Sequence, residues 1–205
     1  MQTIVAEGFR LSPQQKRLWS QIDGTESVAY RVQCAVLIEG RLESAVLKSA
    51  IEDVVARHEI LRTTFQYRAG IKLPLQVIAD GRLEWKGIDL SGVAEGDQQR
   101  SLSELFAVLK DAPFILESGP VVRATLLNFG SQRNILLLSV SALCADGPSI
   151  RIILDEIARA YTARLRGESL DDQPLQYADI SEYFAQLLEV TGCEQAGNFR
   201  LCVLP

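Results

Sequence analysis

Short apolar runs with strand character alternate along this chain with segments that carry a helical hydrophobic period. Runs rich in β-branched residues predict strands at 30–38, 61–65, 73–78, 120–128 and 134–140. Apolar stripes at helical spacing predict helices over 42–55 and 148–165, with two more at about 101–110 and 179–188. Such alternation favours a layered α/β domain. The segment 92–99 between two of these elements is predicted to be a polar connector.

The composition is that of a folded, acidic protein. Hydrophobic residues make up 47% of the chain and charged residues 23%, which excludes a disordered chain or a fibre. A net charge of -5 disfavours binding to phosphate backbones. The start of the chain has no positive region followed by a long apolar run, and no later run reaches the length of a membrane span. We therefore expect a cytoplasmic protein that binds neither nucleic acid nor a membrane.

The counts of histidine and cysteine exclude several kinds of site. His58 is the only histidine, so a catalytic triad or a multi-histidine metal site is excluded unless this residue acts alone. The four cysteines never form CxxC, which is typical of neither a zinc site nor a disulfide framework. Phosphate-binding glycine loops of the forms GxxxxGK[ST] and GxGxxG are absent from the sequence. We expect no directly bound cofactor and no metal.

Five segments carry a family resemblance. They are FRLSPQQKRLW at 9–19, RHEILRTTF at 57–65, APFILESGPVVRATL at 112–126, LCADGPS at 143–149 and LQYAD at 175–179. In this order they resemble the motifs of condensation domains of nonribosomal peptide synthetases. The fourth segment resembles the end of the HHxxxDG active-site motif.

The resemblance implies a fold, a reaction and partners. The fold would be like that of chloramphenicol acetyltransferase, a mixed sheet packed with helices in each of two similar halves. This chain is long enough for the N-terminal half, residues 1–191, followed by an aperiodic tail at 192–205. Such domains join a carrier-bound acyl or peptidyl thioester to the amine of an aminoacyl thioester. Both substrates are carried on phosphopantetheine arms, so carrier proteins and a C-terminal condensation subdomain are the expected partners.

The active-site motif departs from the family. Ser141 and Ala142 occupy the two histidine positions of HHxxxDG, whereas Asp146 and Gly147 are retained. In the family the second histidine orients or deprotonates the amine, and the methyl group of Ala142 can do neither. Loss of a general base typically costs about 10²–10⁴ in rate. Cys144 is interpreted as a packed apolar thiol, and His58 as a structural imidazole.

The retained residues are expected to maintain the fold. By resemblance, Asp146 should form a buried ion pair with Arg62. Asp146 is also suited to cap the helix that opens at Gly147, because an acidic cap followed by an early proline is favoured there. The cluster 14–17, which includes Gln15, is interpreted as a solvated helix start.

Three functional hypotheses remain open from the sequence. The chain could be part of an amide-forming condensation domain, inactive in isolation because it lacks the histidines and the C-terminal half. It could be a non-catalytic interaction module that recruits a carrier protein or a tailoring enzyme. It could also be an inactive remnant. An isolated half is expected to expose an apolar face through which it could form a homodimer.

Overall fold

The computed structural model describes residues 8–21, 30–130, 132–170 and 172–191 and contains two β-sheets. The larger sheet has the strand order β2 (Arg31–Glu39), β7 (Arg133–Ser141), β6 (Val122–Asn128), β5 (Glu84–Asp89). Its strands pair antiparallel except for β5 and β6, which are parallel. The smaller, antiparallel sheet has the order β1 (Gly8–Phe9), β4 (Leu75–Ile78), β3 (Thr63–Gln66). The larger sheet is therefore mixed, as expected.

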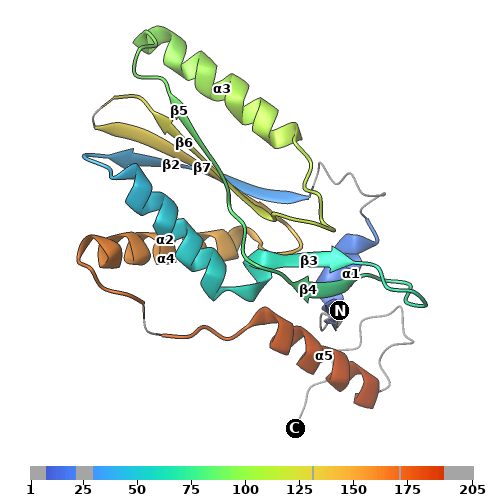
Figure 1. Ribbon diagram of the computed structural model, residues 1–205. Coiled ribbons are helices and arrows are strands. Elements are labelled where there is room, and N and C mark those ends of the chain that lie inside the picture. The colour runs from blue at the N-terminus through green and yellow to red at the C-terminus, as the bar shows by residue number, and fades with distance from the viewer. Residues whose placement is uncertain (1–7, 22–29, 131, 171, 192–205) are drawn as a thin grey trace, which may run out of the picture.

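Helices cover both faces of the larger sheet (Figure 1). On one face, α2 (Ser44–Arg57) and α4 (Gly147–Leu165) pack side by side, and on the other lies α3 (Glu95–Asp111). Leu136 and Leu138 of β7 pack in the cluster with α2 and α4, while Leu137 between them packs in the cluster with α3. Successive strand side chains point to opposite faces, so one continuous apolar strand supplies both layers.

A second assembly surrounds the smaller sheet. It contains α1 (Pro13–Trp19), the 3-10 turn η1 (Glu59–Arg62) and α5 (Tyr177–Thr191). Its core brings together apolar side chains from four segments that are distant in sequence: Leu11, Phe65, the pair Phe114 and Leu116, and Leu143. Because Leu143 belongs to this core, the segment after β7 is anchored to the smaller sheet as well as to the larger one.

The segment 112–126 has a structural role. The guanidinium of Arg123 lies 4.4 Å from the centroid of the Phe114 ring and donates to the carbonyls of Ala112 and Pro113. Gly119 has φ of 68°, a left-handed conformation that favours glycine. The aromatic, glycine and arginine positions of this motif thus shape the connection from α3 to β6.

The predicted elements are confirmed in type, with several corrections to their bounds. The helix predicted at 101–110 begins at Glu95, so the expectation of a polar connector over 92–99 is wrong. Strand β3 begins only at Thr63, because the preceding residues form the 3-10 turn. Strands β1 and β5 were not predicted, since one is too short and the other contains charged residues and a glycine. Residues 192–205, the expected tail, lie outside the described residues.

Candidate functional site

The active-site motif lies where β7 of the larger sheet leads into α4. Strand β7 ends at Ser141 and α4 begins at Gly147, so residues 142–146 form the connecting segment, here called the motif loop. The backbone N–H groups of Cys144 and Ala145 both donate to the Ser141 carbonyl, which closes a tight turn. The Ala142 N–H donates to the carbonyl of Tyr30 beside the strand. These contacts hold the loop at the end of the sheet.

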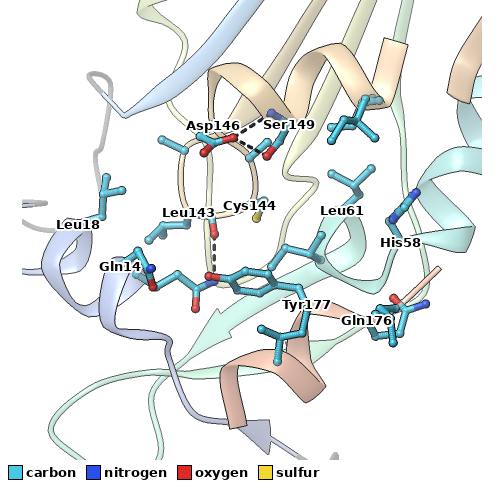
Figure 2. Close-up of a pocket in the computed structure, with 18 residues that line it drawn as sticks. Gln14, Leu18, His58, Leu61, Leu143, Cys144, Asp146, Ser149, Gln176 and Tyr177 are labelled. Atoms are coloured by element: carbon cyan, nitrogen blue, oxygen red, sulfur yellow. Dashed lines mark hydrogen bonds between the residues drawn. The ribbon is translucent and has the colours of Figure 1, made fainter. Parts of the chain in front are cut away.

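The motif loop forms one wall of a pocket of about 440 Å³ (Figure 2). The other walls come from α1, from η1 and the residue before it, from the first turns of α4, and from the start of α5 with the residues before it. The lining is largely apolar, with Ile60, Leu61 and Ile153 among its members. Four of the five sequence motifs contribute to this lining, so the fold brings together segments that are up to about 160 residues apart, in keeping with its non-local contacts.

The two substituted motif positions provide no base in this pocket. Ser141 is 1% exposed, and its hydroxyl accepts a 3.4 Å hydrogen bond from the Leu143 N–H. Ala142 lines the pocket with a methyl group. Neither side chain can accept a proton from an amine near neutral pH.

Asp146 acts as the N-cap of α4. Its carboxylate accepts hydrogen bonds from the Ser149 hydroxyl and, at 2.9 Å, from the Ser149 backbone N–H. Figure 2 shows both bonds at the edge of the pocket. These bonds lower the pKa of the Asp146 carboxyl. The predicted capping role is therefore present in the structure.

The predicted pair of Arg62 with Asp146 is not formed in this structure. Arg62 donates to the Ala79 carbonyl at 3.0 Å and lies 3.5 Å from the Glu59 carboxylate. Asp146 is exposed and is occupied by Ser149. Both charges find partners nearby in sequence, and the helix N-terminus favours the carboxylate that caps it. The expectation of a buried ion pair between Arg62 and Asp146 is therefore wrong, and each side chain has its own local partner instead.

His58 lines the pocket, but its ring is held by a carboxylate. Its Nε2 lies 2.7 Å from Oε2 of Glu156 on α4. The same carboxylate lies 3.6 Å from the guanidinium of Arg57. This arrangement ties the end of α2 to α4 and supports the interpretation of His58 as a structural imidazole.

Cys144 lies in the motif loop and lines the pocket (Figure 2). Burial strongly raises the pKa of its thiol, because the thiolate would lose its hydration. Burial also raises the pKa of Cys34 in β2. A thiol that stays protonated is a poor nucleophile, so the Cys144 environment suits packing. Within the described ranges, no group of three or more acidic, histidine or cysteine side chains could hold a metal ion.

Sequence reasoning missed three polar residues of this site. Gln15 is 2% exposed and donates to the Leu143 carbonyl, so its interpretation as part of a solvated helix start is wrong. Tyr177 shares a 2.7 Å hydrogen bond with Ser12, and burial raises its pKa. Gln176 accepts from the Glu59 N–H and donates to the Arg57 carbonyl. The spacing of Ser12 and Gln15 is that of a capping box, and this signal could have identified Gln15.

Comparison with known proteins identifies the family. The family model described as "Condensation domain" matches residues 5–199. The dimodular nonribosomal peptide synthase of Bacillus subtilis (strain 168) is 34% identical over 186 residues, which are 89% of this chain and 8% of that protein. The chain therefore spans a small part of this curated relative.

Solved structures share the fold. The starter condensation domain of rhizomide synthetase RzmA matches with a TM-score of 0.78 and 22% identity, over 88% of this chain and 44% of that one. The X-domain solved in complex with OxyB from teicoplanin biosynthesis matches with a TM-score of 0.73 and 28% identity, over 97% of this chain and 46% of that one. None of the helices within the described ranges has the length and apolar character of a membrane span. The chain belongs to the condensation domain family of nonribosomal peptide synthetases.

Proposed function

We propose that this chain is the N-terminal part of a condensation domain that serves amide bond formation between carrier-bound thioesters. The observation that carries this proposal is the convergence of four family motifs on one pocket. Gln14 from the first motif, Leu61 from the second, Ala142 from the active-site motif and Gln176 from the last all line it. Carrier proteins would present their phosphopantetheine-bound substrates here, without any directly bound cofactor.

The isolated chain is proposed to be inactive. In the reaction, the acceptor amine attacks the thioester carbonyl, a C–N bond replaces the C–S bond, and the amine proton ends on the departing thiol. A positioned base assists the removal of that proton. Around this pocket, Asp146 is engaged by Ser149, His58 is engaged by Glu156, and burial raises the pKa of the Cys144 thiol. Ala142 supplies no replacement base. The C-terminal subdomain, which is expected to complete the site, is missing from the isolated chain.

An amide-formation assay tests this proposal. Donor and acceptor carrier proteins, loaded with their thioesters, would be mixed with the chain and a separately produced C-terminal half. We expect the Ala142→His variant to form product at least about 10² times faster than the unaltered chain, the lower limit for a general base. The Cys144→Ala variant is the control, and we expect it to match the unaltered chain. Product formed at equal, measurable rates by the unaltered chain and Ala142→His would show that the base is dispensable.

The second candidate is a non-catalytic interaction module. It is favoured by the loss of both motif histidines together with the similarity to the X-domain, which was solved in complex with OxyB. Such a module would recruit a carrier protein or a tailoring enzyme. Absence of product from both the unaltered chain and Ala142→His, together with saturable binding of a carrier protein or a tailoring oxidase measured by calorimetry, would support it over the first candidate.

A further inference from the structure

Gln15 is fully engaged in hydrogen bonds inside the protein. Its Nε2 donates to the Gln76 side-chain carbonyl at 3.0 Å and to the Leu143 backbone carbonyl at 2.9 Å. Its Oε1 accepts a 2.9 Å bond from the Ser12 N–H. Both amide protons and the amide oxygen are therefore paired in a site from which solvent is excluded, since Gln15 is 2% exposed.

The partners of Gln15 are themselves fixed. Gln76 of β4 is 1% exposed and donates to the Arg10 carbonyl at 2.9 Å and to the Ser181 hydroxyl at 3.1 Å. Ser12 bonds Tyr177, which ties the start of α1 to the start of α5. A buried polar network in which each member is paired is rigid, because any displacement leaves a polar group unsatisfied. This network links α1, β4 and α5, and Gln15 is the member that reaches the motif loop.

Leu143 is the residue of the motif loop that is hydrogen-bonded to this network. Its side chain is 3% exposed in the core of the smaller sheet, and its carbonyl is the acceptor for Gln15. Ala142 and Cys144 on either side of it both line the pocket. A shift of the Leu143 carbonyl would therefore displace both of these lining residues. We propose that Gln15 is a positioning residue that fixes the motif loop against the pocket through the Leu143 carbonyl.

Alkylation of Cys144 tests this role, because its thiol lies in the loop that Gln15 is proposed to fix. The chain and its Gln15→Met variant would be treated with iodoacetamide under native conditions, and modification would be followed by peptide mass spectrometry. Cys34 in β2 is partly exposed and lies outside the motif loop, so it is the internal reference for changes elsewhere in the larger sheet. We expect about a tenfold faster reaction of Cys144 in the variant, the factor for losing one buried hydrogen bond from a local opening equilibrium. The Cys34 rate should stay unchanged.

Two further variants control the experiment. Gln14→Met makes the same chemical change at an exposed neighbour that lines the same pocket, and we expect the wild-type Cys144 rate. Gln15→Glu keeps an acceptor for the Ser12 N–H and so preserves the capping box, but it loses the donor to Leu143. It should therefore also accelerate Cys144 alkylation.

Three results would overturn the proposal. They are an unchanged Cys144 rate in folded Gln15→Met, a parallel rise at Cys144 and Cys34, and failure of both Gln15 variants to fold, since the last two indicate a purely structural residue. The relevance of the loop to catalysis rests on the proposed function. The alkylation assay requires no amide formation, so either proposal can fail while the other stands.

Discussion

Asp146 and Arg62 illustrate how local partners decide the contacts of single side chains. The resemblance predicts an ion pair between these two side chains. Instead, Asp146 accepts hydrogen bonds from Ser149, three residues later in the sequence, and Arg62 lies near Glu59, three residues earlier. The first turn of a helix presents N–H groups without intrahelical partners, and a carboxylate there is stabilised by them and by the helix dipole. Local geometry of this kind needs no long-range loop closure.

Replacing Asp146 by alanine should destabilise the protein in a pH-dependent way. The expected loss is about 1 kcal/mol at pH 7, the usual cost of removing an acidic N-cap. Because the folded-state pKa of Asp146 is lowered, its contribution is present above the unfolded pKa of about 3.9 and is lost as the pH falls through the lower, folded value. Urea unfolding from pH 7 to about pH 2 covers the range in which this contribution is present and then lost.

The control for the Asp146 substitution is Asp155→Ala, on an exposed position within the same helix. This change removes the same charge without a capping bond and improves helix propensity, so it should not destabilise. A deficit for Asp146→Ala that stays constant across the acid range would contradict the assigned role of the carboxylate.

Among the secondary-structure elements, the C-terminal end of α3 is capped by arginine side chains from two strands of the larger sheet. Arg31 of β2 donates to the carbonyls of Leu109 and Ala112, at 2.6 and 2.7 Å, and Arg123 of β6 also bonds Ala112. The last carbonyls of a helix have no intrahelical partners and favour positive charge. The ring of Phe114 lies against both guanidinium groups. This cluster closes the junction between α3 and the larger sheet.

Arg123→Met should therefore weaken this junction. We expect the free energy of unfolding to fall by about 2 kcal/mol, in the range for hydrogen bonds made by a charged group. Hydrogen exchange should accelerate most in the last turn of α3. Arg133→Met is the matched control, because Arg133 also lies over a phenylalanine ring, at 5.6 Å, but is exposed. Similar losses in the two variants would argue against a specific role of the carbonyl contacts.

At the scale of the whole molecule, the pocket opens on a face with exposed apolar side chains. Ile152, Leu175 and Ile180 line the pocket and are 59%, 87% and 38% exposed. Contiguous exposed apolar surface marks interaction sites in soluble proteins. The chain spans 44% of the RzmA starter domain, which it matches in fold. Under the proposed function, we propose this face as the contact surface for a C-terminal condensation subdomain.

Ile152→Lys should weaken association with a separately produced C-terminal half. The expected loss of affinity is about tenfold or more, given the transfer free energy of a buried isoleucine side chain. Sedimentation velocity titrations measure this, and they would also report a homodimer formed through the same face. Val108→Lys on the outer surface of α3 is the control, since Val108 is 67% exposed away from the pocket lining. Equal affinities for the two variants would place the interface elsewhere.

The helices and most strands could be predicted because their apolar periods are local properties. The stripes of α2 and α4 and the continuous apolar run of β7 give their type directly. Strand β5 could not be found in this way. It is stabilised by parallel pairing with β6, a neighbour that only the fold supplies.

The family, the missing base at Ala142 and the capping role of Asp146 could be predicted from the amino-acid sequence, because they depend on residue type and short spacing. The partners of the charged and buried polar groups became evident only from the fold. It paired His58 with Glu156 across 98 residues and Gln15 with Leu143 across 128. The polar residues next to Gln15 in the sequence predict that it is exposed. Its burial follows instead from packing against β4 and the motif loop. Such contacts depend on loop closure over long separations, which no local pattern encodes.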